Sequence, residues 1–151
     1  MTAQATMPSL SIAAIADADV SNVVALWQAC GLTRPWNDPS ADIALARRGP
    51  NSAVLVGRDA GAIVATAMVG HDGHRGWVYY VAVDPRCQGK GLGRTMMQAV
   101  EDWLRQAGVP KLQLLIRREN AKASAFYQTL GYEESTSVML AKWLDGREAT
   151  P

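Results

Sequence analysis

The sequence contains little cysteine, no excess of charge of one sign and no long apolar run. Cys30 and Cys87 lie far apart without the spacing of a metal site, so we expect reduced thiols in a cytoplasmic protein. The 15 basic and 14 acidic residues give a net charge of +1, which argues against a nucleic-acid binder with a basic stripe. The longest apolar stretch, residues 62–69, is far too short to span a bilayer.

The length of 151 residues predicts one domain, which we place at residues 9–145 between a flexible leader (1–8) and a polar tail (146–151). The leader carries no basic-then-apolar signal pattern. Periodicity and turn residues predict a mixed α/β sheet in the order β-α-α-β-β-β-α-β-α-β-β. The expected strands are 10–15, 53–58, 62–70, 76–83, 111–116, 132–134 and 137–143. We expect Asp17 or Asp19, Asp38 and Asn120 to cap helices, with Ile43 and Leu45 of the second helix facing inward.

Residues 76–107 are the centre of the sequence. The β-branched and aromatic run 76–83 predicts a buried strand, and Asp84-Pro85 ends it because proline cannot donate to a sheet ladder. Glycines then alternate at 89, 91 and 93, and apolar residues recur at helical spacing at positions 92, 96, 99, 100, 103 and 104. A glycine-rich turn between a strand and a helix is a frequent anion site, since the first amides of the helix point at the anion.

Two common anion motifs do not fit this turn. A phosphate loop would need glycine where Asp84 stands, and a dinucleotide fingerprint starting at Gly89 would need glycine or alanine where Arg94 stands. The pattern Gln88-x-x-Gly91-x-Gly93 resembles the pyrophosphate motif of the GCN5-related N-acetyltransferases, the GNAT family.

A second motif supports this resemblance about thirty residues further along. Residues 120–132 run from Asn120 through Ala123, Phe126 and Tyr127 to Gly131-Tyr132, and they look like the other signature of the family. The resemblance covers residues 10–143 and implies the GNAT fold, with a central sheet that splays between strands 76–83 and 111–116. Within the family, residues 34–39 and 72–76 look most like the bacterial YpeA-like acetyltransferases.

The resemblance implies that acetyl-CoA is the co-substrate and that no metal is needed. The amides of residues 88–94 would hold the pyrophosphate, and Val81 and Val83 would pair with the pantetheine arm as with an extra strand. A main-chain N–H near Ala82 would stabilise the oxyanion, and Asn120 would hydrogen-bond the arm. The implied cofactor residues are Val81, Ala82, Val83, Gln88, Gly89, Lys90, Gly91, Leu92, Gly93, Arg94, Asn120 and Tyr127.

Two side chains are our candidates for proton transfer. Tyr127 would donate to the departing thiolate, although it could instead be an ordinary core tyrosine. Some family members use a glutamate in the central strands as the base, and this sequence has none there. His74 is the first replacement because its pKa lies near working pH, while a structural role in a surface loop remains an alternative. Asp72 is available beside His74 at the start of the central strand, and Tyr79, Tyr80 or Glu119 could act through water.

The resemblance implies that the loop at residues 34–39 borders the acceptor site. An acidic and aromatic lining of Trp36, Asp38 and Asp42 would suit a cationic amine. Arg34 and Arg75 would instead suit an amine that also bears a carboxylate. A rigid loop held by its prolines is the alternative. The candidate substrate residues are Arg34, Trp36, Asp38, Asp72 and Tyr79.

The leading interpretation is an N-acetyltransferase that moves the acetyl group of acetyl-CoA to a primary amine of a small molecule or peptide in a ternary complex. A non-catalytic acyl-CoA sensor or partner subunit is the alternative, and a nicotinamide-dependent redox domain is a third. We expect no nucleic-acid or membrane partner, and homodimerisation is consistent with the exposed sheet edges of this fold.

Overall fold

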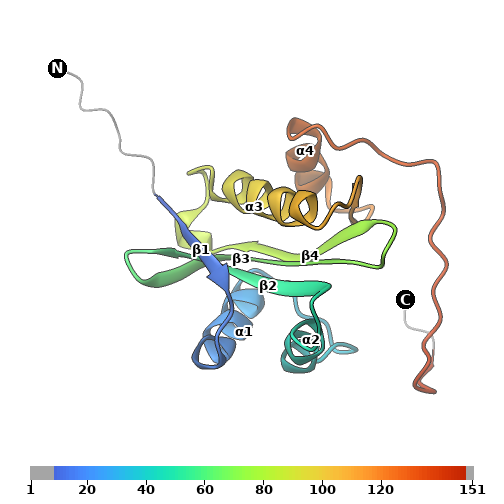
Figure 1. Cartoon of the computed structure of the whole chain (residues 1–151), viewed down its shortest axis with the longest axis horizontal. Helices are drawn as coiled ribbons and strands as arrows, with labels where there is room; N and C mark the ends of the chain where they lie inside the picture. Colours follow the sequence, from blue (N-terminus) through green and yellow to red (C-terminus); the bar gives the residue numbers. More distant parts are fainter. Residues whose placement is uncertain (1–8, 149–151) are drawn as a thin grey trace. The chain divides into compact units, whose positions relative to one another are not determined.

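The computed structural model describes residues 9–148, and the chain divides between Leu115 and Ile116 into two compact units. The first unit contains five strands in the order β1-β2-β3-β4-β5. Figure 1 labels β1 to β4. Neighbouring strands are antiparallel except β4 and β5, which are parallel, so the predicted mixed α/β fold class is confirmed. The strands are β1 (Ser11–Ala14), β2 (Ser52–Asp59), β3 (Ala62–His71), β4 (Gly76–Val83) and β5 (Leu112–Gln113).

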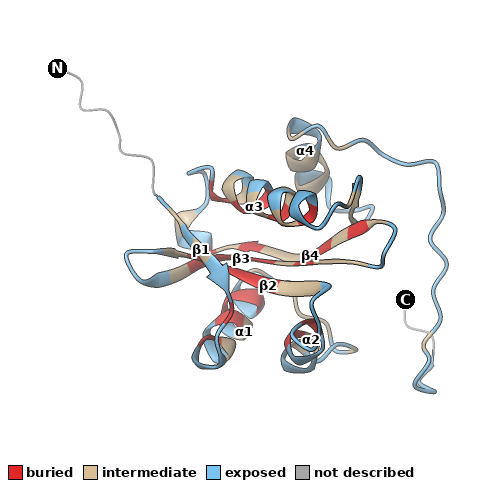
Figure 2. Cartoon of the chain, viewed as in Figure 1, coloured by how far each residue is buried: buried red, intermediate tan, exposed pale blue. Residues whose placement is uncertain are grey.

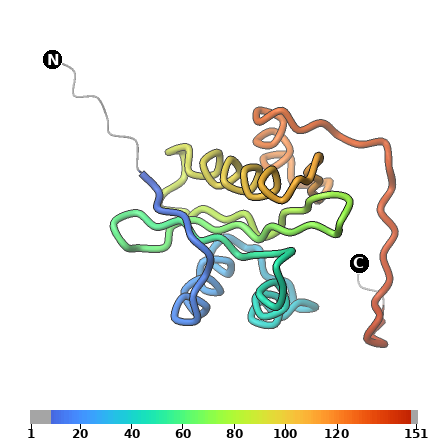
Figure 3. The backbone as a smooth tube through the Cα atoms, viewed as in Figure 1, coloured from blue at the N-terminus to red at the C-terminus, as the bar shows by residue number. Residues whose placement is uncertain are grey.

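Helices cover both faces of this sheet. The helices α1 (Val20–Ala29) and α2 (Pro39–Ala46) lie on one face, and α3 (Leu92–Gln106) lies on the other (Figures 1 and 3). Two short 3₁₀ turns, η1 (Asp17–Asp19) and η2 (Pro85–Cys87), precede α1 and α3. The second unit has one regular element among its described residues, α4 (Ala121–Thr129).

Local sequence signals account for most of these boundaries. The Asp38 carboxylate accepts hydrogen bonds from the main-chain amides of Ser40 and Ala41, which caps α2 as predicted. Between β2 and β3, Ala60 and Gly61 have φ values of 50° and 86°. Two successive left-handed residues are typical of a type I′ hairpin turn, whose twist matches that of the flanking strands.

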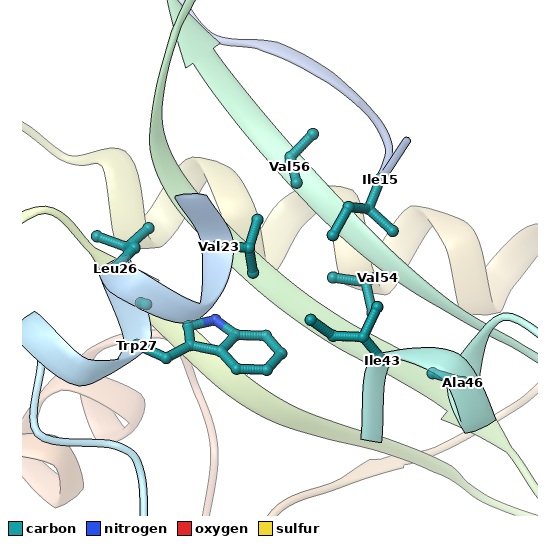
Figure 4. Packing of buried hydrophobic residues seen from close by; sticks show 9 residues of the cluster. Ile15, Val23, Leu26, Trp27, Ile43, Ala46, Val54 and Val56 are labelled. Atoms are coloured by element: carbon teal, nitrogen blue, oxygen red, sulfur yellow. The ribbon is translucent and has the colours of Figure 1, made fainter. Parts of the chain in front are cut away.

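The core between the sheet and α1 and α2 surrounds Trp27. Figure 4 shows this indole among aliphatic side chains of α1, α2 and β2. Figure 2 shows the same concentration of buried residues along the sheet and the inward helix faces. Ile43 is 1% exposed, as predicted, but Leu45 is 61% exposed, so the prediction for Leu45 was wrong. The two residues lie about 200° apart on a helix, so they cannot both face the sheet.

The helix α3 packs unusually close to β4. Its buried residues are Leu92, Met96, Met97, Val100 and Leu104, and Met97 was absent from the predicted stripe. A Cβ atom at Gly76 would lie 2.5 Å from Leu104 Cδ1, so a larger residue at the start of β4 would require the Leu104 side chain or α3 to move. This close contact fixes the helix whose first residues follow the glycine turn.

Several predicted boundaries differ from the structure. The strand predicted at 111–116 is only two residues long, and the described residues of the segments 132–134 and 137–143 form no strand, so those two predictions were wrong. Val138 and Leu140 are 82% and 92% exposed; a strand needs a neighbouring strand, and the described part of the second unit offers none. The predicted leader 1–8 and residues 149–151 lie outside the described residues. The single domain at 9–145 stays a prediction.

Within residues 9–148, no helix is long and apolar enough to cross a membrane. In the same range, no group of three or more His, Cys, Asp or Glu side chains is arranged to hold a metal ion.

Candidate active site

The glycine turn leads from β4 into α3 through two left-handed residues. Gly89 has φ 82°, and Gly91, the N-cap of α3, has φ 77°. A Cβ atom at Gly89 would meet nothing within 4 Å, so glycine is needed there for its backbone conformation rather than for space. Lys90 and Arg94 are exposed beside the turn. The turn therefore combines the unpaired amides of a helix start with two cations, which suits an anionic group.

Asp84 anchors the other end of this turn. Its carboxylate accepts from the Arg86 main-chain amide at 2.9 Å and pairs with the Arg86 guanidinium at 2.9 Å. The Arg86 side chain, followed by the amide bond, holds the pKa of Asp84 below its usual range. The Asp84 amide donates to the Val64 carbonyl at 2.8 Å, which ties the turn to β3.

Beyond its first two residues, β4 has an open edge. In the described residues, β5 pairs with Gly76 and Trp77 only, so residues 78–83 have no β5 partner. The predicted separation of strands 76–83 and 111–116 requires an edge of β4 without a neighbouring strand. Unpaired N–H and C=O groups on a strand edge can accept another extended chain.

A β-bulge decides which amides face this edge. The register runs Met68↔Tyr79 and then Thr66↔Ala82, so Tyr80 and Val81 together lie opposite Ala67. The Gly76 amide donates to Lys111 on the β5 side, and the Asp84 amide donates to β3. Alternation along the strand from these two fixed ends turns the main-chain groups of Val81 and Val83 to the open edge and those of Ala82 towards β3. The Val83 carbonyl already accepts from Cys30 Sγ at 3.3 Å and from Gln88 Nε2 at 3.4 Å, so Val83 offers its amide to a ligand.

Tyr80 adopts the left-handed conformation of the bulge, with φ 53°. A non-glycine residue there is strained by roughly 1–3 kcal/mol, so its surroundings must hold it. Its ring stacks on Trp27 at 3.8 Å and 7°, and its hydroxyl donates to Asp42 at 2.7 Å. Burial, and then the hydrogen bond to Asp42, raises the pKa of Tyr80. From the sequence, Tyr80 was predicted only as an alternative base acting through water, because a bulge position has no local sequence signal.

His74 lies in the β3–β4 loop, before the start of β4. Val81 lies seven positions further along the chain, which corresponds to roughly 20 Å along an extended strand. Asp72 organises this loop: its Oδ1 accepts from the amides of His74 at 2.9 Å and Arg75 at 2.8 Å. The Arg75 amide, followed by the His74 amide, holds the pKa of Asp72 below its usual range. The structure therefore separates His74 and Asp72 from the bulge.

The predicted acceptor residues are mostly engaged in local structure. Arg34 donates to the carbonyls of Gly31 at 2.8 Å and Thr33 at 3.0 Å, and Asp38 caps α2. Trp36 is half-buried in the same loop. Tyr79 is 47% exposed, and partial burial raises its pKa. Because Tyr79 pairs with Met68, which packs against the core beneath α1 and α2, its side chain faces that side of the sheet.

In the second unit, Asn120 is the N-cap of α4 and Tyr127 lies within this helix. The Asn120 Oδ1 atom accepts from the Ala123 amide at 3.1 Å and caps the helix, as predicted. The Tyr127 ring packs edge-on against Phe126 and Tyr132, at centroid distances of 5.0 Å and 5.8 Å. Burial raises the pKa of Tyr127 to about 12, so its hydroxyl keeps its proton at neutral pH.

An open depression of about 620 Å³ lies elsewhere on the first unit, between α1, the β2–β3 turn and residues 84–86. None of the residues predicted to bind the cofactor lines it. Its arginines, Arg58 and Arg86, are paired with Asp19 and Asp84. The glycine turn and the edge of β4 therefore remain the candidate site.

Comparison with known proteins agrees with these features. The model of the acetyltransferase (GNAT) family matches residues 21–132. The chain is 37% identical over 135 residues to acetyltransferase YE1169 of Yersinia enterocolitica, covering 89% of this chain and 96% of that protein.

Solved structures share the fold. The Escherichia coli ribosomal-protein-S18-alanine N-acetyltransferase is similar with a TM-score of 0.72 and 26% identity, covering 85% of this chain and 80% of that chain. The aminoglycoside N-acetyltransferase AAC(6′)-Iy in complex with CoA has a TM-score of 0.76 at 16% identity, covering 91% and 96%. The closer resemblance to the YpeA-like subgroup stays a prediction.

Proposed function

The chain belongs to the acetyltransferase (GNAT) family, and from this premise we propose that it moves the acetyl group of acetyl-CoA to a primary amine of a small molecule or peptide. The observation that carries the proposal is the bulged, open edge of β4 leading into a left-handed glycine turn at the start of α3. One end of this arrangement suits an extended amide-containing chain, and the other suits a diphosphate. Acetyl-CoA contains both groups and supplies the acyl thioester.

In this proposal the amides of residues 88–94 bind the pyrophosphate, with Lys90 and Arg94 nearby as counter-charges. Val81 and Val83 pair with the pantetheine arm, and Asn120 donates to it through its side-chain Nδ2 group. The N–H group near Ala82 that fits the oxyanion is that of Val81, because alternation turns the Ala82 groups towards β3. Such a donor, held in place before reaction, is worth roughly 100- to 1000-fold in rate.

Tyr127 is the proposed acid for the departing thiolate. A thiol pKa of about 8.5 lies well below the pKa of about 12 that burial gives Tyr127, so full transfer of the phenol proton to the thiolate is uphill. The phenol therefore stabilises the departing thiolate by donating a hydrogen bond to it. An attacking alkylamine must lose its proton first, which costs roughly 4–5 kcal/mol at pH 7 for a lysine-like amine. The distance of His74 from Val81 along β4 argues against direct proton removal by His74.

Two solved relatives are named as N-acetyltransferases, one for a ribosomal-protein alanine and one for aminoglycosides, which supports an amine acceptor. The loop containing Arg34, Trp36 and Asp38, together with Tyr79, forms our proposed surroundings for that amine, whereas Asp72 lies in the β3–β4 loop away from the bulge. We also propose a cytoplasmic location, which is consistent with the free thiols of Cys30 and Cys87, and a homodimer.

The test is release of free thiol from acetyl-CoA with a panel of amines, polyamines, amino acids and peptide N-termini. Turnover with at least one acceptor, and its loss in Tyr127→Phe while CoA binding persists, supports the proposal. CoA binding without thiol release on any acceptor would instead identify a non-catalytic acyl-CoA sensor.

A further inference from the structure

We infer that Tyr80 is a positioning residue for acetyl transfer, held in the β4 bulge by Trp27, Thr66 and Asp42. We call these four residues the bulge clamp. The inference rests on the proposed function, since it concerns the Val81 amide that would face the thioester oxygen. In this inference, the direction in which the Val81 N–H points is fixed by side chains from four different elements, α1, α2, β3 and β4.

The bulge determines the direction of the Val81 amide. Without the extra residue, strict alternation from Gly76 would turn the amides of Tyr80 and Ala82 to the open edge and that of Val81 to β3. A one-residue change of register reverses every later side chain and amide of the strand. The position of the reactive amide therefore depends on keeping Tyr80 in its left-handed conformation.

Thr66 holds the main chain of Tyr80. Its hydroxyl donates to the Tyr80 carbonyl at 3.0 Å and accepts from Trp27 Nε1 at 2.8 Å. Both Thr66 and Trp27 are 0% exposed. Because the indole N–H can only donate, it leaves the Thr66 proton for the Tyr80 carbonyl, so the direction of both hydrogen bonds is fixed.

The side chain of Tyr80 is held at two further points. The ring lies flat on Trp27, at 3.8 Å and 7°, and the hydroxyl donates to Asp42 Oδ2 at 2.7 Å. Asp42 belongs to α2, the helix that begins directly after the proposed acceptor loop. The same contacts therefore connect the oxyanion amide to the helix beside the amine site.

Ala60 offers a matched comparison. Apart from the glycines, it and Tyr80 are the positive-φ residues of the described chain, but Ala60 lies in the β2–β3 turn, where the turn itself requires that conformation. Ala60→Gly relieves backbone strain of the same kind without touching the clamp. It is therefore the control for a general effect on stability.

The experiment compares Thr66→Val, Thr66→Ser and Ala60→Gly in melting temperature, CoA binding and steady-state thiol release with the best acceptor. Valine keeps the shape of threonine and removes the hydroxyl, whereas serine keeps the hydroxyl. We expect Thr66→Val to lower kcat by about 10- to 100-fold while KM for acetyl-CoA changes less than about threefold, since a small misplacement of a reacting group has this effect. Thr66→Ser is expected to recover most of kcat, and Ala60→Gly to keep the wild-type value.

Tyr80→Phe and Asp42→Asn test the other contact of the clamp. Asparagine can still accept from the phenol, so Asp42→Asn is expected to keep most of kcat and an unchanged pH profile, while Tyr80→Phe lowers kcat severalfold. If Asp42→Asn abolishes turnover and removes the acidic limb of the profile, Asp42 is a proton acceptor and the positioning role is overturned.

The outcomes separate this inference from the proposed function. A wild-type protein that releases thiol, together with a folded Thr66→Val variant of unchanged kcat, refutes the inference alone. A wild-type protein that binds CoA and releases no thiol on any acceptor refutes the proposed function. If Thr66→Val melts too early to assay, the Tyr80→Phe and Asp42→Asn pair decides.

Discussion

The close packing of α3 on β4 makes Gly76→Ala a demanding test of the fold that positions the glycine turn. The new Cβ atom would lie 2.5 Å from Leu104 Cδ1, 2.8 Å from Cδ2 and 3.2 Å from Cγ. Carbon atoms in contact normally stand about 3.5–4.0 Å apart, so α3 must shift away by about 1 Å or Leu104 must leave its rotamer. Leu104 is 2% exposed and has little space to move. We expect the free energy of unfolding to fall by roughly 1–3 kcal/mol.

The assay is denaturant unfolding of the wild type, Gly76→Ala and the control Gly49→Ala. A Cβ atom at Gly49 would meet nothing within 4 Å, and its φ is not positive, so this variant should be neutral or slightly stabilising. Leu104→Ala alone should cost about 2–5 kcal/mol. Combined with Gly76→Ala it should cost less than the sum, because the new methyl group enters the vacated space. Equal stabilities of the Gly76 and Gly49 variants would refute the packing argument.

The remaining predictions concern catalysis and pH. Tyr127→Phe should lower kcat by roughly 100-fold or more with little change in KM for acetyl-CoA, as expected for loss of a general acid; an unchanged kcat excludes that role. His74→Ala should leave kcat within about twofold, given roughly 20 Å of strand between His74 and Val81; a large loss of kcat with unchanged folding would restore His74 as the base. The Arg58 guanidinium holds the pKa of Asp19 below its usual range. The pair therefore stabilises the fold above about pH 4, the pKa of Asp19 in the unfolded chain. This stabilisation is lost as the pH falls through the lower pKa that Asp19 has in the folded protein. Melting temperatures between pH 6 and 3 should therefore fall less steeply in Asp19→Asn than in the wild type, and parallel curves would contradict this.

The central strand, the glycine turn and the following helix were predictable because each has a local cause. Pro85 ends β4, left-handed glycines form the turn, and the apolar spacing from Leu92 to Leu104 defines the buried face of α3. Family resemblance supplied the chemistry of this turn, which spacing alone limited only to an anion site.

The bulge clamp was not predictable from local sequence. Trp27 meets Thr66 across 39 residues, and Asp42 meets Tyr80 across 38, so no window of sequence contains the interaction. The last two predicted strands failed for a related reason. Alternating residues near Val138 fit a strand, but strand formation depends on a partner edge that periodicity does not supply.

The central claim is that the main-chain amides at the end of β4 and the start of α3 hold CoA. Titration of ¹⁵N-labelled protein with CoA, followed by amide chemical shifts, tests it most directly. We predict that the largest changes fall on the amides of residues 88–94 and on Val81 and Val83, with little change at Ala60 or at His74. Saturable CoA binding that moves other amides and leaves these in place would contradict the account.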